Sequence, residues 1–294
     1  MSEPGKGYTF AMLSALLSGT NYVLGKVVLA NLSPAHLVAL IFSIATLIQG
    51  AWMLQTGQWR EVLHCSARAW RYVLLFSALS IAALWTLWTG VKYLDPSVAA
   101  FISRLQTLVT VFLGIWLLGE RFRIMEAVGG VVVISGVALL YATEGVEVSL
   151  WFWVMVASGV FWGITEVVAK VALRHINATP LSFIRTSIVA LFYLLLLTIQ
   201  GQPLLGLGHR WWGVIGIALM GPTLARWFYL FALKRLAVSK ASLVNQIQPI
   251  FVAMVAFTFL GTIPGIRDWI GGLLILAGCT VMIWGQIRGL GIRG

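Results

Sequence analysis

Residues 18–29 read SGTNYVLGKVVL, and residues 162–173 read WGITEVVAKVAL. The two stretches share a glycine, two valines, a lysine and a leucine at equal spacing, with a shift of 144 residues. Apolar helices can resemble one another by chance, but a glycine and a lysine that recur in register argue against that explanation. The sequence therefore predicts an internal repeat.

The composition indicates where this repeat folds. Of the 294 residues 60% are hydrophobic and 10% are charged, against roughly 45–50% and 25% in soluble domains. Because a membrane span needs about 20 apolar residues, the length supplies about ten spans and leaves no room for a soluble catalytic domain. We therefore expect an all-α integral membrane protein. Its predicted helices cover residues 8–30, 34–55, 69–92, 96–118, 124–141, 149–174, 180–199, 211–235, 239–260 and 266–287.

Three of these helices have a marked start, because a capping residue is followed by proline in Ser33-Pro34, Asp95-Pro96 and Thr179-Pro180. Basic residues predict the orientation. With the N-terminus inside, twelve loop Lys and Arg residues face the cytoplasm and three face outward, so both termini are predicted to be cytoplasmic. This asymmetry accounts for most of the net charge of +11, and no nucleic acid partner is expected.

The similarity between the halves continues toward their C-terminal ends, where the shift becomes 142 residues. We expect one repeat in residues 1–145 and the other in residues 146–294. Five spans per repeat is an odd number, so the halves would lie inverted across the membrane, with the binding site near the midplane between them. The matches at this second shift are Lys92 with Lys234, Gln106 with Gln248, Leu118-Gly119 with Leu260-Gly261, Gly129-Gly130 with Gly271-Gly272, and Gly136 with Gly278.

At these residues the chain resembles the drug/metabolite transporter superfamily, in particular its EamA-type exporters, which have ten spans in two five-helix repeats. The resemblance covers nearly the whole chain, and it implies export as the direction of transport. It rests on Trp162-Gly163 followed by Lys170, on Pro249 in the ninth span, on Gly119-Glu120-Arg121 after the fourth span, and on glycines 129, 130, 136, 271, 272 and 278.

The chain departs from the family pattern at several positions. Ser18 replaces the usual tryptophan of the first repeat, Thr107 stands opposite Pro249, and Thr262 stands opposite Glu120. The four-helix multidrug relatives carry a proton-exchanging acid eight residues before the repeat lysine. Ser18 and Trp162 occupy that position here, so this coupling scheme is not carried over.

Five basic residues lie inside predicted spans, where an ionisable group costs at least about 2.5–3.5 kcal/mol and faces a wet cavity or a partner. Arg104 and Arg226 lie too deep to be interface residues. Since a guanidinium binds a carboxylate or phosphate with two parallel hydrogen bonds, they predict a substrate with an anionic group. Pairing with Glu166, or with carbonyls freed at a broken helix, is the alternative. Lys26, Lys170 and Arg185 are expected to extend from near helix ends to the membrane surface.

Glu166 is the one acid well inside a predicted span. Two interpretations stay open. Glu166 forms an ion pair with Lys170 four residues later, or Glu166 and Lys170 form a proton or substrate-amine site.

Polar and aromatic residues near two predicted helix breaks complete the candidate site. Pro249 in the ninth span and Pro222 in the eighth each remove a helix hydrogen bond and free carbonyl groups. A polar cluster beside such a break is typical of transporter sites, although hydrogen bonding between helices explains it as well. Aromatic rings suit an amphipathic substrate, and packing against lipid is the alternative. The candidate substrate-binding residues are Arg104, Gln106, Arg226, Trp227, Asn245, Gln246, Gln248, Tyr22, Trp85 and Trp162.

These features predict a secondary transporter that exports a small metabolite, an amino acid or similar zwitterion, by alternating access across the plasma membrane (the cell inner membrane). The alternative is an exchanger or proton-coupled efflux carrier for phosphorylated or drug-like compounds. An intramembrane enzyme would need a nucleophile–base or metal constellation that does not stand out, and a passive channel would lack saturable exchange. The sequence has no G-x-x-x-x-G-K-[ST] motif, so a substrate or ion gradient must supply the energy.

No cofactor is expected. Cys65 and Cys279 form no C-x-x-C motif, and no histidine cluster has metal-ligand spacing, so no metal site is predicted. The expected partners are the small-molecule substrate and the lipid bilayer. The oligomeric state stays open, with a monomer allowed.

Overall fold

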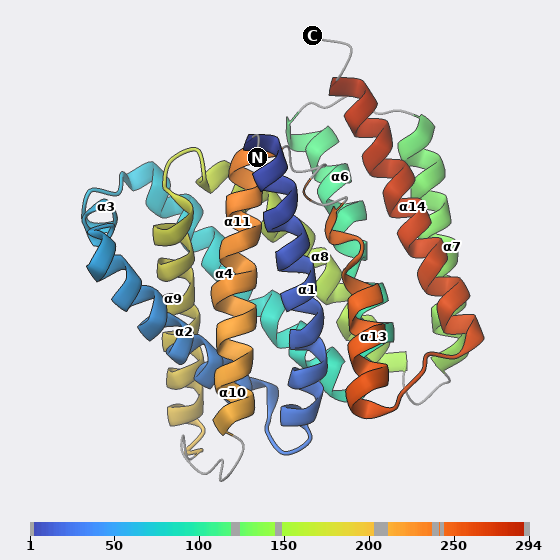
Figure 1. The fold of residues 1–294 in the computed structure, drawn as a ribbon, viewed down its shortest axis with the longest axis horizontal. Coiled ribbons are helices and arrows are strands. Elements are labelled where there is room, and N and C mark those ends of the chain that lie inside the picture. The colour runs from blue at the N-terminus through green and yellow to red at the C-terminus, as the bar shows by residue number, and fades with distance from the viewer. Residues whose placement is uncertain are drawn as a thin grey trace.

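The structure is a computed structural model that describes residues 3–118, 124–144, 149–202, 211–236, 241 and 244–290. Within these ranges every regular element is a helix (Figure 1). The elements are α1 (Glu3–Leu29), α2 (Pro34–Thr56), α3 (Trp59–Leu63), α4 (Ala67–Tyr93), α5 (Pro96–Ser103), α6 (Leu105–Leu118), α7 (Ile124–Glu144), α8 (Ser149–Ala172), α9 (Ala178–Ile199), α10 (Trp211–Ala218), the π-helix η2 (Leu219–Ala225), α11 (Arg226–Arg235), α13 (Gln248–Leu260) and α14 (Ile266–Leu290).

The expected all-α membrane architecture is confirmed at this level. Eight helical segments of the described chain are long and apolar enough to cross a membrane, and two further apolar helices, Ile124–Leu140 and Gln248–Leu260, are shorter. The count of ten spans stays a prediction. Helix α1 begins and α14 ends at the same end of the bundle (Figure 1). Which side of the membrane this end faces also stays a prediction.

Capping residues start two helices as expected. Ser33 Oγ accepts a hydrogen bond from the His36 amide at 3.2 Å, and Asp95 Oδ1 accepts one from the Ser97 amide at 2.8 Å. The third predicted start is wrong by two residues, because α9 begins at Ala178 with Asn177 as its cap. The Asn177 side chain donates to Glu61 Oε2 instead of capping its own helix.

Predicted spans are interrupted where polar residues enter the interior. The fourth predicted span is divided at Arg104, whose amide donates to the Phe101 carbonyl in a tight turn between α5 and α6. The eighth contains the π-helix η2 around Pro222. Because proline lacks an N–H, the helix widens there, and the Pro222 carbonyl accepts a hydrogen bond from Gln49 Nε2 at 3.1 Å.

The expectation for Pro249 is wrong. Pro249 lies in the first turn of α13, where a proline removes no helix hydrogen bond. Among the described residues, Asn245 is helical, Gln246 and Ile247 form a turn, and α13 begins at Gln248, so the ninth predicted span is interrupted directly before Pro249. The motif Gly119-Glu120-Arg121 lies outside the described residues.

The helices pack in a reciprocal pattern. Helix α1 packs against α10, η2 and α11, while α8 packs against α4; α2 packs against α9, and α7 against α14. In Figure 1 α7 and α14 lie side by side at one edge. Their backbones approach closely at glycines: a Cβ atom at Gly129 would lie 2.6 Å from the Gly278 carbonyl oxygen, and one at Gly136 would lie 2.7 Å from the Gly271 carbonyl oxygen.

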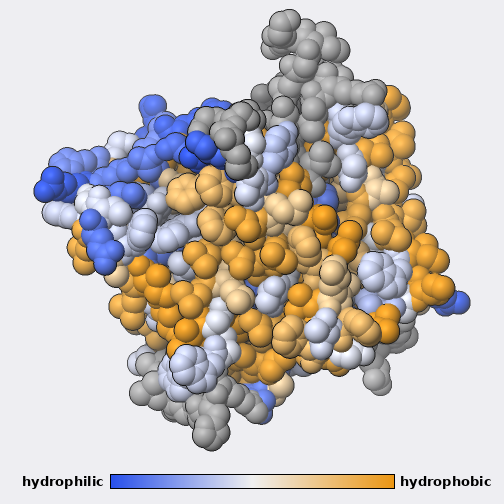
Figure 2. All heavy atoms as spheres, viewed as in Figure 1, coloured by the Kyte–Doolittle hydropathy of each residue, from blue (hydrophilic) through white to orange (hydrophobic). Residues whose placement is uncertain are grey.

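The surface of the bundle has the pattern expected for contact with lipid. Figure 2 shows hydrophobic side chains across the middle of the visible face and hydrophilic ones gathered over α3 and the adjoining helix ends. Large apolar residues such as Trp116 and Phe259 are more than two-thirds exposed. Apolar patches of this extent mark a surface that is covered by another apolar phase.

Candidate functional site

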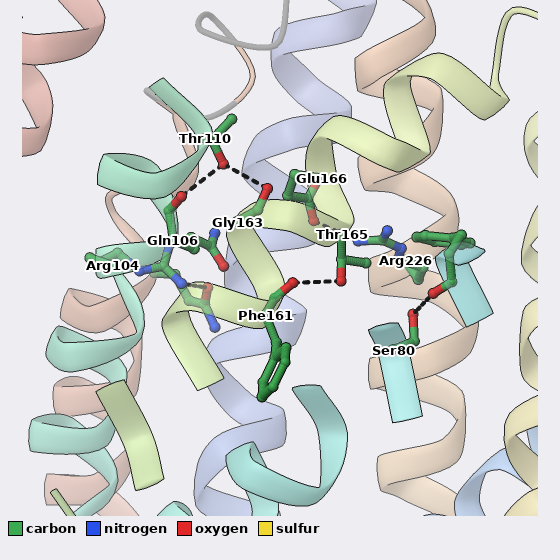
Figure 3. Close-up of polar contacts among 11 residues, drawn as sticks. Ser80, Arg104, Gln106, Thr110, Phe161, Gly163, Thr165, Glu166 and Arg226 are labelled. Atoms are coloured by element: carbon green, nitrogen blue, oxygen red, sulfur yellow. Dashed lines mark hydrogen bonds and ion pairs between the residues drawn. The ribbon is translucent and has the colours of Figure 1, made fainter. Parts of the chain in front are cut away.

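A cavity of about 140 Å³ lies among the helices of both halves of the chain. A cavity of about 150 Å³ holds a molecule the size of benzene, so the occupant in this conformation must be small. The lining combines polar, aromatic and aliphatic side chains, as in sites for small ligands. Figure 3 shows several of its residues, with Arg104 and Gln106 on one side and Glu166 and Arg226 facing each other on the other.

The cavity is lined by corresponding positions of the two halves. Six pairs of residues, related by the shift of 144 in the first two helices of each half or of 142 in the later helices, both contribute to its wall: Ser18 with Trp162, Tyr22 with Glu166, Ile41 with Arg185, Leu84 with Arg226, Leu87 with Tyr229, and Gln106 with Gln248. In three of these pairs only one member is charged. Glu166, Arg185 and Arg226 belong to the second half, and their counterparts Tyr22, Ile41 and Leu84 are uncharged at neutral pH.

Arg104 lies at the break between α5 and α6 and is 2% exposed. Its Nη1 donates to the Asn245 carbonyl at 2.9 Å, and its Nη2 donates to Gln248 Oε1 at 2.8 Å and to Ser103 Oγ at 3.2 Å. All three acceptors are neutral. The arginine therefore joins the broken fourth span to the start of α13 while its charge stays uncompensated by these contacts.

Arg226 follows the π-helix η2 and forms a buried ion pair. Its Nη1 donates to Glu166 Oε1 at 2.9 Å. The guanidinium also lies 5.2–5.8 Å from the ring centres of Phe76, Trp162 and Tyr229. Glu166 Oε2 and the Nε and Nη2 groups of Arg226 have no hydrogen-bond partner within the described residues.

Arg185 corrects an expectation. The sequence places it near a helix end with its head at the membrane surface, but in the structure it is 1% exposed and lines the cavity from α9. Its guanidinium lies 5.3 Å from the ring centre of Phe42 and 5.5 Å from that of Phe76. Helix α9 packs against α2 and α4 and buries one of its faces. Arg185 belongs to this buried face, together with Leu181, Ser182 and Ile184.

The repeat lysines lie at helix ends outside the cavity wall. Lys26 Nζ donates to the carbonyls of Lys92 and Leu94 at 2.8 and 2.7 Å, where α4 ends. Lys170 Nζ donates to the carbonyls of Leu233 and Leu236 at 2.9 and 3.4 Å, where α11 ends. Of the interpretations left open for Glu166, the pair with Lys170 is wrong, because both side chains have other partners.

The remaining candidate residues divide into two groups. Tyr22, Trp162, Gln106, Asn245 and Gln248 line the cavity. Gln246 does not; its Nε2 donates to Thr107 Oγ1 at 2.7 Å between two helices. Trp85 is 53% exposed on the outside of α4, and Trp227 packs against Trp52 with ring centres 6.0 Å apart.

In place of Trp85 and Trp227, the cavity wall contains Trp88 and Tyr229, which lie one turn or less further along the chain, in addition to the predicted Tyr22 and Trp162. Helix rotation decides this, because a side chain three residues further on lies about 60° around the helix and one two residues further on lies about 160° around it. Trp88 follows Trp85 and Tyr229 follows Trp227 closely in the sequence, but periodicity alone does not tell which member of each pair points inward. For Arg185, the sequence feature that could have indicated an inward-facing position was its correspondence with Ile41, an apolar residue of an apolar helix.

The described residues contain no group of three or more His, Cys, Asp or Glu side chains that could hold a metal ion. The described lining contains three guanidinium groups and one carboxylate. This arrangement can hold a small polar molecule by charge-assisted hydrogen bonds from buried side chains.

The EamA-like transporter family matches residues 5–142 and again residues 149–284. A protein of Clostridium kluyveri described as an uncharacterized transporter is 22% identical over 289 residues, which cover 94% of this chain and 92% of the relative. An uncharacterized transporter of Haemophilus influenzae is 23% identical over 140 residues, covering 47% of this chain and 45% of the relative.

A solved crystal structure matches 97% of this chain and 98% of its own, with a TM-score of 0.69 and 20% sequence identity. At this identity the match shows a shared fold. The cavity described above therefore lies in an architecture that is not peculiar to this sequence.

Proposed function

The chain belongs to the EamA-like transporter family of the drug/metabolite transporter superfamily, and from this premise we propose that it exports an amino acid or similar zwitterion across the plasma membrane by alternating access. As a multi-pass membrane protein of this family it is a transporter. The substrate, the direction and the mechanism are the content of the proposal.

The observation that carries the proposal is the pairing of donors and an acceptor in one small cavity. Arg104 and Arg185 offer guanidinium groups without a carboxylate partner in the described residues, and Glu166 Oε2 is an acceptor without a donor. A zwitterion presents the complementary groups, a carboxylate and an ammonium. Charge-assisted hydrogen bonds of this kind are about twice as strong as neutral ones.

Alternating access is supported by the reciprocal packing of the helices and by the paired positions in the cavity wall. When corresponding positions of two halves line one site, exchanging the conformations of the halves would open it to the other side. The substrate or an ion gradient would drive the cycle. Glu166 is the acid in the described cavity wall that can also carry a proton.

The excess of positive charge also favours the second candidate function, exchange of a phosphorylated compound. A phosphate would contact the same guanidinium groups with two parallel hydrogen bonds. A cationic drug-like compound is disfavoured, because three arginines and one glutamate in the described lining leave a positive site.

Counterflow in proteoliposomes tests the proposal. Vesicles containing the purified protein are preloaded with pooled amino acids, and uptake of each labelled amino acid is measured. We expect saturable exchange in the wild type, strong loss in Arg104→Ala and Glu166→Gln, and retention in Arg174→Ala, a control at an exposed arginine beyond α8. Exchange of organic phosphates but of no amino acid would reject the amino-acid substrate and support the second candidate.

A further inference from the structure

The cations of the cavity outnumber its anions. Among the described lining residues, Glu166 is the one carboxylate, and it is bonded to Arg226. Arg104 contacts only neutral oxygen atoms. Nε and Nη1 of Arg185 have no hydrogen-bond partner within the described residues, and the carboxylate of the described lining is bonded to Arg226 instead. Two guanidinium charges therefore lack an anion.

Arg185 is the clearest case of an unbalanced charge in the described lining. It is 1% exposed, and its Nε and Nη1 groups have no acceptor among the described residues. The rings of Phe42 and Phe76 are its nearest charge-stabilising contacts. Taking an ion out of water has an effective penalty of several kcal/mol even after the protein relaxes, and a guanidinium is always charged in proteins.

A second cation lies nearby. Arg185 and Arg226 both lie over Phe76, with guanidinium carbons 5.5 and 5.2 Å from its ring centre. The two charges are therefore within about 11 Å of each other. Like charges at this distance in a poorly solvated interior repel. Glu166 balances one of the two charges through its ion pair with Arg226, and an anion in the cavity would balance the other.

We propose that the substrate is a zwitterion with an additional acidic group, such as an acidic amino acid, and that Arg185 and Arg104 bind its two acidic groups. Its ammonium group binds Glu166 Oε2, so that its two negative charges and one positive charge complement the site. This inference rests on the proposed function and narrows its substrate class. Arg185 is then the residue by which the protein discriminates acidic from neutral amino acids as substrates.

The purified protein in detergent tests this directly, with L-aspartate, its neutral isostere L-asparagine, and succinate, which lacks the ammonium group. The measurements are the ligand-induced rise in unfolding temperature and the inhibition of counterflow. We expect wild-type protein to bind aspartate at least about tenfold more tightly than either of the others, because one charged hydrogen-bonding contact changes affinity by about ten- to a hundredfold.

Arg185→Met is the decisive variant, because methionine keeps an unbranched side chain against the two phenylalanine rings. We expect the preference for aspartate over asparagine to disappear while asparagine binding is retained. We also expect ligand-free Arg185→Met to be at least as stable as the wild type, since the variant removes an unpaired buried cation. A merely structural role for Arg185 predicts the opposite, a lower unfolding temperature without ligand.

Two further variants keep the test decisive. Arg185→Lys retains the charge but not the planar guanidinium group, and we expect an intermediate preference for aspartate over asparagine. Arg174→Met is the exposed control and should keep the wild-type preference. Equal binding of aspartate and asparagine by the wild type overturns this inference while leaving the proposed function intact. Absence of exchange and of binding for every amino acid overturns both.

Discussion

Glu166 has a lysine four residues later on its own helix, but its carboxylate contacts Arg226 on another helix at 2.9 Å. Lys170 instead extends to the end of α11. Helix C-termini present carbonyl groups without partners, and those at the end of α11 accept hydrogen bonds from Lys170. The carboxylate of Glu166 is paired with Arg226, the cation that is buried beside η2. At the scale of residues, the charges of the cavity are therefore fixed by contacts between helices.

Replacement of one member of this pair should be more harmful than replacement of both. Glu166→Gln leaves the Arg226 charge buried without a carboxylate, and breaking a buried pair in this way costs about 3–5 kcal/mol. We expect a large fall in unfolding temperature for Glu166→Gln and partial recovery in Glu166→Gln with Arg226→Gln. Thermal unfolding in detergent measures both; a double variant less stable than the single would contradict the pairing.

At the scale of elements, the repeat lysines stabilise helix ends. Lys26 donates two hydrogen bonds of 2.7–2.8 Å to the end of α4, and Lys170 makes one of 2.9 Å and a longer one of 3.4 Å to the end of α11. A cation at a helix C-terminus also interacts favourably with the helix dipole. The duplicated lysine of the sequence thus has the same structural role in both halves.

This role predicts a loss of stability without loss of substrate recognition. We expect Lys26→Met and Lys170→Met each to lower stability by about 1–3 kcal/mol, with Lys26→Met the larger because both of its bonds are short. Unfolding temperatures and counterflow activity are the measurements, with exposed Arg68→Met as control. Abolished exchange in well-folded Lys170→Met would support its alternative role as a proton or amine site.

The contact between α7 and α14 depends on individual glycines, and two neighbours differ sharply. A Cβ at Gly129 would lie 2.6 Å from the Gly278 carbonyl oxygen, whereas one at Gly130 would meet only Leu108 Cδ1 at 3.5 Å. We expect Gly129→Ala to destabilise by about 1–3 kcal/mol through overpacking. Gly130→Ala should be neutral or stabilising by up to about 1 kcal/mol, since alanine favours helix. Similar unfolding temperatures for the two variants would argue against this packing.

At the scale of the whole molecule, labelling of Cys65 can test the orientation of the chain in the membrane. It lies between α3 and α4, at the end of the bundle where α1 begins (Figure 1). Burial raises the pKa of its thiol, and the nearby Glu61 carboxylate raises it further. Because the thiolate is the reactive form, a raised pKa leaves little of it at neutral pH, and reactivity increases as the pH rises toward the pKa.

We therefore expect a membrane-impermeant maleimide to label Cys65 in inverted vesicles and not in right-side-out vesicles, if the N-terminus is cytoplasmic. Labelling should be slow at pH 7 and faster at pH 8.5. Cys65→Ser should abolish it, because Cys279 is fully buried. Labelling of wild-type protein from the outside alone would reverse the predicted topology.

The sequence by itself determined the class of the molecule, because membrane spans need long apolar runs and because a repeat is visible as matching residues at a fixed shift. It also indicated Arg104, Arg226 and Glu166 as candidate site residues, since ionisable groups are expensive within apolar helices, and all three line the cavity. The capping residues at Ser33 and Asp95 fixed two helix starts through local hydrogen bonds.

Only the tertiary structure decided which side chains face the cavity and which ions pair. Arg185 faces inward, Trp85 faces outward, and Pro249 begins a helix rather than breaking one. Each of these depends on the rotation of a helix against its neighbours and on where a helix begins. In a chain that is apolar on nearly every helix face, hydrophobic periodicity does not report that rotation, because lipid and the protein interior accept the same residues.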